Sequence, residues 1–513
     1  MAKASKTRAS KQAYVSQNQL ILSGFETPFD NKLDQSNRWI KLAHQIPWDN
    51  IVNVYTQTLF NDTTGASNIN PRVVLGCIMI KHMCNLSDEE TILQIQENMY
   101  MQYFIGYSSF SNEAPFDPSL FVEIRKRFGV EQINSINEKI VGLSQAKNSS
   151  TKNENNSSPT KNNPPPSEDQ NNSDTINDEN KKELDKKTHD GRLIIDATAC
   201  PQDISYPTDL NLLNDAREKS QELIGVLYVQ YLHKKKPRTY RKQARKAYLN
   251  TAMKRQKTRK EIRKALRKQL NYLKRNLGHI EKLHQAYPKG KTPLTEREQT
   301  YLLVIQELYS QQYQMFREKT HSIEDRIVSI HQPYVRPIVR GKEKAKVEFG
   351  AKIQLSLVAG YAFLDVLSWD AFNEGTKLLL AVENHKKRTG YYPIEVLADK
   401  IYCNRNNRKQ LKELGIRLLA KPLGRPSAMN TEHVSPGERK PIEGKFGQGK
   451  TSYGLGRIKA RLENTSESWI ASIILVLNLV KLAGQAPLSI IENLIQNIMR
   501  WCKIKNNLTL LFQ

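Results

Sequence analysis

Hydrophobic and polar positions change their spacing several times along this chain of 513 residues. In residues 37–143 the apolar side chains recur every three or four positions, which predicts a group of helices. Pro71 follows Asn70 at one predicted helix start, and Ser87 with Glu90 begins a second helix after a short turn. This helix-turn-helix-like spacing leaves two interpretations open, contact with DNA or plain packing.

A polar segment separates these helices from sequence that favours strands. Residues 144–190 are rich in Asn, Ser and Pro, which is typical of a disordered linker. The apolar run GRLIIDATAC follows and predicts a buried strand. Strand patterns return at 346–360, 362–368, 394–400 and 416–422, and helical patterns lie at 377–385 and 404–414. The expected fold class is therefore α/β, with a mixed sheet flanked by helices.

Most of the positive charge lies in one helical region after the first strand. Residues 234–275 contain 19 Lys and Arg and one acid, Glu261, which gives +18 of the total formal charge of +26. An apolar stripe runs through the same region and, after a capping-box pattern at Thr295 and Glu298, through a second helix, so an antiparallel hairpin is predicted. Its seam is expected to pack on itself, and its basic face to contact a polyanion. The candidate DNA contacts there are Lys254, Arg255, Arg259, Arg263 and Arg267.

Composition excludes several other classes of protein. With 38% hydrophobic and 25% charged residues, the chain is expected to be a soluble globular protein of two or more domains. Its basic, polar beginning does not have the apolar core of a secretion signal. The apolar run from Trp469 is interrupted by Asn478 and Lys481, which predicts a buried helix and not a membrane span. Five scattered cysteines without a CxxC pair predict a reducing compartment.

Three acids are candidates for chemistry. Asp196 and Asp399 each end an apolar strand, where a carboxylate is costly unless it is paired or holds a cation. Glu443 lies at a predicted helix entry among basic residues. An ion pair or helix cap remains the alternative for each acid alone, but together they suit two Mg²⁺ ions and phosphodiester chemistry. Asp365 is predicted to face outward from an alternating strand, and the Walker-like letters of residues 444–451 follow no buried strand.

These motifs together resemble the DDE transposases of bacterial insertion sequences, the insertion-sequence four and five superfamily, which has a ribonuclease-H-like core. The resemblance covers residues 40–130 and the segments around Asp196, Asp399 and Glu443. In the family signature Y-x2-R-x3-E-x6-K, the last three positions are Arg439, Glu443 and Lys450, and Pro436 stands at the tyrosine position. The resemblance implies that Asp196, Asp399 and Glu443 are the catalytic, metal-binding triad, and that Arg439 and Lys450 contact DNA phosphate.

The resemblance also implies a function and a division of the chain. We expect a DNA transposase that binds terminal inverted repeats as a homodimer, uses two Mg²⁺ ions or Mn²⁺ in their place, and cleaves and joins DNA in the bacterial cytoplasm, at the nucleoid. The alternatives are a ribonuclease-H-like nuclease without strand transfer and a non-catalytic DNA-binding derivative. The expected parts are a basic arm (1–36), a helical DNA-binding domain (37–143), a linker (144–190), a catalytic domain (191–209 and 326–485), a basic helical insertion (210–325) and a C-terminal helical tail (486–513).

Overall fold

The computed structural model describes residues 33–57, 69–154, 188–288, 291–339, 347–421 and 436–484. Most of the predicted basic arm, the predicted linker from residue 155 to 187 and the predicted tail 486–513 lie outside the described residues.

A six-stranded mixed sheet forms the centre of the molecule. β1 pairs antiparallel with β3 and parallel with β5, β2 and β4 both pair antiparallel with β3, and β6 pairs parallel with β5. The strands are β1 (Arg192–Pro201), β2 (Arg336–Val339), β3 (Val347–Val358), β4 (Tyr361–Ser368), β5 (Glu395–Leu397) and β6 (Arg417–Leu419). Only β2 was not predicted as a strand. This mixed sheet flanked by helices is compatible with a ribonuclease-H-like fold, as expected from the sequence.

The N-terminal region is helical, as predicted. Its helices are α1 (Arg38–Gln45), α2 (Trp48–Thr56), α3 (Pro71–Cys84), α4 (Asp88–Glu97), α5 (Met99–Ile105), α6 (Leu120–Arg127) and α7 (Val130–Glu154). The side chains of Asn70 and Ser87 cap α3 and α4. α7 continues past residue 143 into the segment predicted as a linker, because residues 144–154 are polar but contain neither Pro nor Gly to end a helix.

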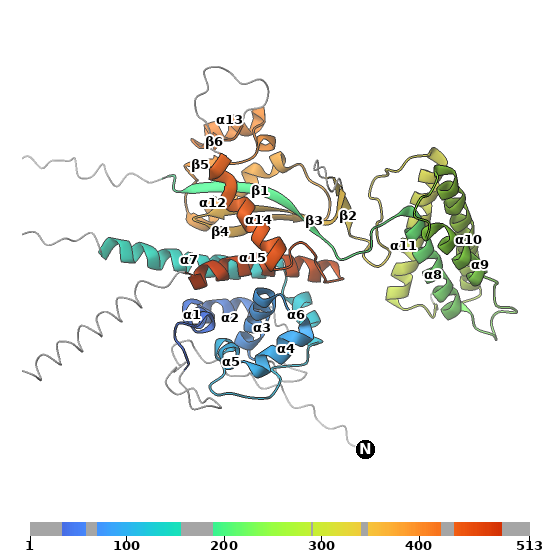
Figure 1. The fold of residues 1–513 in the computed structure, drawn as a ribbon, viewed down its shortest axis with the longest axis horizontal. Coiled ribbons are helices and arrows are strands. Elements are labelled where there is room, and N and C mark those ends of the chain that lie inside the picture. The colour runs from blue at the N-terminus through green and yellow to red at the C-terminus, as the bar shows by residue number, and fades with distance from the viewer. Residues whose placement is uncertain are drawn as a thin grey trace, which may run out of the picture.

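The N-terminal helices share one core with the sheet. α15 (Glu463–Gly484) and α7 lie between the two parts (Figure 1). α15 is apolar on almost every side and is buried along most of its length, so it needs cover on both sides. Buried residues of the N-terminal helices, of α15 and of one sheet face form a single cluster. The separate N-terminal domain expected from the sequence is therefore not confirmed, because α15 joins the two parts.

Polar contacts also tie α15 to both neighbours. The buried Asn478 donates from Nδ2 to Asn137 Oδ1 of α7 (2.8 Å) and to the carbonyl of Ala362 in β4 (2.7 Å). Its Oδ1 accepts the Ala362 N–H at 2.8 Å. In the described part of the chain, α15 is the one helix long and apolar enough to cross a membrane, but 72% of its apolar window is buried inside the protein. This is the buried core helix that the sequence predicts.

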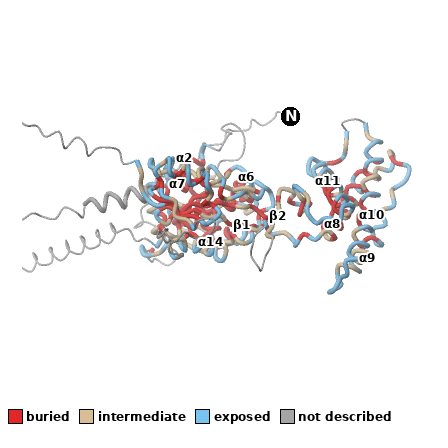
Figure 2. Tube along the Cα trace, turned by 90° about the horizontal axis from the view of Figure 1, so that it is seen from above, coloured by how far each residue is buried: buried red, intermediate tan, exposed pale blue. Residues whose placement is uncertain are grey.

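Four helices between β1 and β2 form a second body with its own core. They are α8 (Asp209–Leu227), α9 (Arg241–Ala252), α10 (Arg259–Gln285) and α11 (Glu296–Glu318). They stand beside the sheet (Figure 1), and their buried residues gather among α8, α10 and α11 (Figure 2). The predicted pair corresponds to α10 and α11, and α11 has the predicted capping box at Thr295 and Glu298. The structure adds α9, and α8, which packs against both α10 and α11.

The remaining helices pack around the sheet. They are α12 (Leu378–Thr389), α13 (Arg405–Glu413) and α14 (Lys440–Ser452), with the short 3₁₀ helices η4 (Glu374–Lys377), η5 (Lys400–Tyr402) and η6 (Pro436–Arg439). α12 and α14 pack against β1, and α13 lies beside β6. η5 connects the end of β5 to α13, and η6 leads directly into α14. These two connections position the acids described next.

Candidate active site

The pairing of two parallel strands brings Asp196 and Asp399 together. Ile194 of β1 lies opposite Leu397, the last residue of β5. Continuing this register by two residues places Asp399 beside Asp196. Both aspartates therefore lie at the edge where the carboxyl end of β5 meets the middle of β1.

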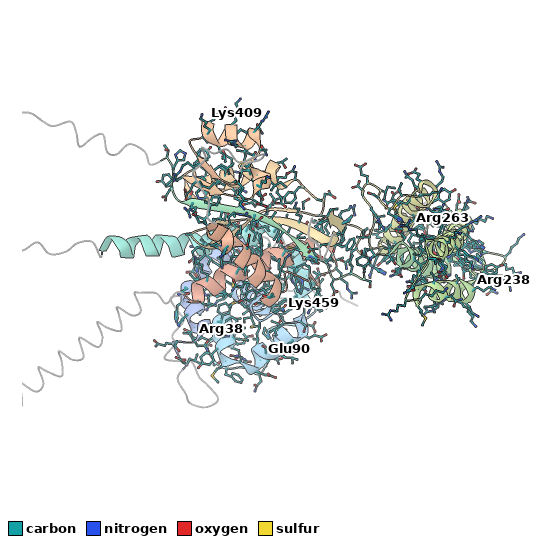
Figure 3. All side chains as sticks on the ribbon, turned by 45° about the horizontal axis from the view of Figure 1, so that its top comes forward. Arg38, Glu90, Arg238, Arg263, Lys409 and Lys459 are labelled. Carbon is teal, nitrogen blue, oxygen red and sulfur yellow. The ribbon has the colours of Figure 1, made fainter. Side chains whose placement is uncertain are left out.

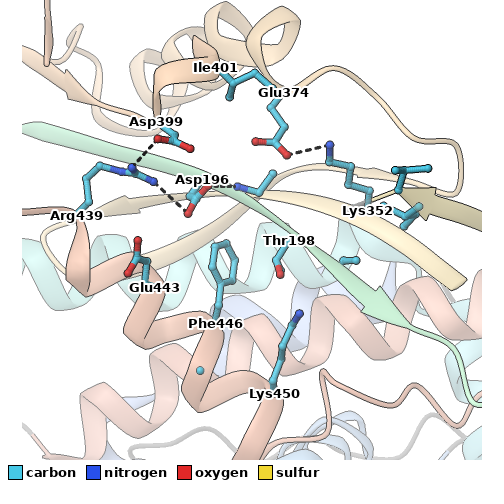
Figure 4. Close-up of a pocket in the computed structure, with 15 residues that line it drawn as sticks. Asp196, Thr198, Lys352, Glu374, Asp399, Ile401, Arg439, Glu443, Phe446 and Lys450 are labelled. Atoms are coloured by element: carbon cyan, nitrogen blue, oxygen red, sulfur yellow. Dashed lines mark hydrogen bonds and ion pairs between the residues drawn. The ribbon is translucent and has the colours of Figure 1, made fainter. Parts of the chain in front are cut away.

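The end of η6 and α14 together supply a third acid and two cations from one face, because Arg439 is the N-cap residue of α14. At 100° per residue, positions 439, 443 and 450 fall within about 40° of one another around a helix. Figure 4 shows Arg439, Glu443, Phe446 and Lys450 along the side of α14 that faces β1. The R-x3-E-x6-K spacing thus has a simple geometric meaning, since it places all three side chains on one helix face.

These elements enclose a cleft of about 830 Å³. All five residues predicted for catalysis or phosphate contact line it, namely Asp196, Asp399, Arg439, Glu443 and Lys450. Sequence reasoning missed Thr198, Lys352 and Glu374, which also line it. Lys352 Nζ and Glu374 Oε1 form an ion pair at 2.9 Å. Thr198 could have been found, because it is two residues from Asp196 and so on the same face of β1.

Arg439 lies between the two aspartates. Its Nη1 donates to Asp399 Oδ1 at 3.0 Å and its Nη2 to Asp196 Oδ2 at 3.4 Å (Figure 4). Within the described residues, its buried Nε has no hydrogen-bond partner. The guanidinium therefore offsets one of the two negative charges, and its Nε–H remains without a partner among these residues.

The chemistry of the three acids fits a divalent metal, but their spacing in this structure does not. Carboxylate oxygens are the ligands that Mg²⁺ and Mn²⁺ prefer. However, in the part of the chain that the structure describes, no three His, Cys, Asp or Glu side chains are close enough to hold a metal. Arg439 lies between the two aspartates, and Glu443 is exposed on α14. A metal held by Asp196 and Asp399 would have to displace this guanidinium.

Burial raises the pKa of Asp196 to about 6. The Ala197 N–H and the Arg439 guanidinium act in the opposite direction, whereas Glu374 and Asp399 add to the rise. Without a bound metal, the Asp196 carboxyl therefore holds a proton more firmly than an ordinary aspartate does. A metal cation bound to it would favour the charged form.

This pKa predicts a stability cost that a neutral side chain removes. The pKa of Asp196 is about 6 in the folded protein, against 3.8 for an ordinary aspartate. The folded protein therefore loses stability as the pH rises from 3.8 to about 6, and this loss remains at higher pH. Asp196→Asn in metal-free buffer is therefore expected to raise the free energy of unfolding above about pH 7 by up to about 3 kcal/mol, with little gain near pH 4. Urea denaturation at both pH values measures it.

The control for this experiment is Asp370→Asn, since Asp370 is an exposed acid paired loosely with Arg336 at 3.8 Å. It should change stability by less than about 0.5 kcal/mol at either pH. A gain for Asp196→Asn that is the same at both pH values would contradict the raised pKa.

The predicted DNA contacts outside the cleft lie on the second helical body. Lys254 and Arg255 are in the connection from α9 to α10, and the other three are on α10, at positions 259, 263 and 267. All five side chains are exposed. Lys254 pairs with Glu261 at 2.5 Å, and Arg263 lies 4.2 Å over the ring of Phe316. Figure 3 shows Arg263 and Arg238 on this body, away from the sheet, so the structure does not bring these residues into the cleft.

One further sequence expectation needs correction. Asp365 does not face outward, because its side chain is fully buried and pairs with Arg388 at 2.8 Å. The Walker-like letters of residues 444–451 lie inside α14, so they form no phosphate-binding loop, in agreement with the sequence, where no buried strand precedes them.

The helix-turn-helix-like pair is built as core. α3 is buried along almost its whole length. α4 begins with three acids, of which Asp88 pairs with Lys81 and Arg125, both at 2.8 Å, while Glu89 and Glu90 are exposed. In a DNA-reading motif the start of the second helix approaches the bases, and acids there would repel phosphate. This arrangement favours packing over DNA contact.

Two segments of the chain match known protein families. Residues 27–127 match a family described as a transposase domain (DUF772), and residues 396–480 match the transposase DDE domain. The second match includes Asp399, Arg439, Glu443 and Lys450, and Asp196 lies outside both. The two matches indicate an insertion-sequence transposase. Its assignment to the insertion-sequence four and five superfamily stays a prediction.

One relative is similar over a shorter stretch. The uncharacterized protein ORF8 in the nfe locus of Rhizobium meliloti is 30% identical over 112 residues, which is 22% of this chain and 53% of that protein. The chain thus spans about half the length of this relative. No solved structure matches the chain.

Proposed function

We propose that this protein is a DNA transposase that cleaves the ends of an insertion sequence at terminal inverted repeats and joins them to target DNA. The observation that carries the proposal is the convergence of Asp196, Asp399 and Glu443 on one cleft, beside the cations Arg439 and Lys450. The matching transposase families support it.

In this proposal the three acids form the catalytic triad. They would hold two divalent cations, Mg²⁺ or Mn²⁺, which when bound activate the attacking oxygen and stabilise the leaving oxygen of a phosphodiester. Once cations displace it from the aspartates, Arg439 would turn to the substrate, where its planar fork fits two phosphate oxygens. Lys450, two turns along the same helix face from Glu443, adds a point charge farther along the DNA backbone.

The second helical body is the proposed DNA-contacting insertion of the catalytic domain. Residues 234–275 carry a charge of +18, and the candidate contacts on it are exposed. A surface of this charge binds duplex DNA through release of condensed counterions. Two ends must be held for joining, so we propose a homodimer assembled on DNA in the bacterial cytoplasm, at the nucleoid.

The test is cleavage and joining by the purified full chain. The substrate is a labelled duplex carrying the terminal repeat that flanks its gene, with a supercoiled plasmid as target and Mg²⁺ or Mn²⁺ added. Nicked ends and labelled plasmid are expected, and chelation should abolish both. Cleavage without labelled plasmid would support a ribonuclease-H-like nuclease without strand transfer. Repeat binding without either reaction would support a non-catalytic DNA-binding derivative.

A further inference from the structure

A second basic surface lies on α13. Its four cations, Arg405, Arg408, Lys409 and Lys412, are all exposed and occupy positions i, i+3, i+4 and i+7. This spacing gathers them into one stripe along the helix. The buried residues of α13 are Asn407 and Leu411, so the stripe faces away from the core.

Most of this charge has no ion-pair partner among the described residues. Lys409 lies 3.9 Å from Glu413, but in the described part of the chain Arg405, Arg408 and Lys412 form no ion pair. Like charges three and four residues apart repel each other and weaken a helix. The stripe borders an open groove of about 680 Å³ between α13 and β6, which is also lined by Arg417, itself paired with Glu395 at 3.1 Å. A bound polyanion would relieve this repulsion.

The position of the stripe relates it to the active-site cleft. Asp399 leads through η5 into α13, and Ile401 of η5 lines the cleft. Figure 3 shows Lys409 on the body that holds the sheet, well apart from Arg238 and Arg263 on the α8–α11 body. Among the residues that the structure describes, the α13 surface is therefore separate from the basic surface of the α8–α11 body, and it follows the cleft residues directly along the chain.

We propose that α13 and β6 bind the phosphate backbone of a second DNA duplex, the target into which cleaved ends are joined. The inference rests on the proposed function, because joining requires two duplexes at one cleft. A stripe of four cations contacts phosphates and carries no information about base sequence. That property fits a duplex held by its backbone, whereas the terminal repeat must be distinguished from other DNA.

The test compares two variants with three cations removed from each. Arg405→Ala/Arg408→Ala/Lys412→Ala removes three of the four cations of the stripe, and Lys126→Ala/Arg127→Ala/Lys387→Ala removes three exposed cations elsewhere. We expect the first variant to transfer pre-cleaved ends into plasmid at least about 10-fold more slowly, while its cleavage of the terminal repeat stays within about twofold. The control should stay within about twofold in both assays. Arg405→Lys/Arg408→Lys keeps the charge and should retain strand transfer, which separates charge loss from misfolding.

A second readout does not require catalysis. The salt dependence of binding to a duplex of unrelated sequence should lose a slope of about 2.7 in the stripe variant and less than about 1 in the control. The proposal is overturned if cleavage and joining fall together, since the surface would then hold the element end, or if slope and joining both remain as in the wild type. If the wild type neither cleaves nor joins, the proposed function fails, and the slope alone decides whether α13 binds DNA.

Discussion

Asp399→Asn and Glu443→Gln are each expected to lower the rate of end cleavage on the order of 1000-fold or more, while affinity for the terminal-repeat duplex stays within about threefold. Each change removes one negative oxygen ligand and leaves the volume of the side chain nearly the same. Asp399 is half-exposed and Glu443 is exposed, so neither side chain is part of the hydrophobic core. Single-turnover cleavage of labelled duplex, with binding measured separately, gives both quantities.

Asp370→Asn and Glu97→Gln are the matched controls, because both replace an exposed acid outside the cleft with its amide. They should cleave at the wild-type rate. Wild-type cleavage by Asp399→Asn would instead mean that the cleft is not the catalytic site. A parallel loss of binding and cleavage would point to damaged folding, which thermal melting of each variant detects.

The positions of the three acids could be read from the sequence because each has a local signal. Asp196 and Asp399 each end an apolar run, and the parallel pairing of β1 with β5 brings them together, although Asp196 lies in the middle of β1 and Asp399 just beyond the end of β5. Glu443 shares a helical face with Arg439 and Lys450, and their spacing alone shows it. No such signal exists for Glu374 and Lys352, which come from η4 and β3 and meet only when the sheet has formed.

Burial of polar residues was the hardest feature to predict. Asp365 lies in a strand whose alternating pattern predicts an outward side chain. Its partner Arg388 is supplied by α12, so the sequence of the strand gives no indication of the pair. The core that the N-terminal helices share with the sheet could not be predicted for a similar reason. The apolar run of α15 predicts burial but not which two layers cover it, because that depends on the packing of α7 and the sheet around Asn478.

Removing three cations from the α9–α10 region, Arg255→Ala/Arg259→Ala/Arg267→Ala, is expected to weaken binding of the terminal-repeat duplex about 100-fold at about 0.15 M salt. The estimate follows from counterion release, in which each lost phosphate contact costs a factor of about 5 at this salt concentration. The three side chains are exposed and have no ion pair within the described residues. Fluorescence anisotropy of labelled duplex across a salt series measures the change.

The salt series also gives this prediction its sharpest test. Counterion release contributes more binding free energy in dilute salt. The loss of affinity in the variant should therefore grow as the salt concentration falls and nearly vanish towards 1 M, and the slope of log affinity against log salt should be lower by about 2.7. The control Lys126→Ala/Arg127→Ala/Lys387→Ala removes the same formal charge from other surfaces, so it should change the slope by less than about 1. A deficit that is equal at all salt concentrations would indicate altered folding of α10 and would contradict phosphate contact by these side chains.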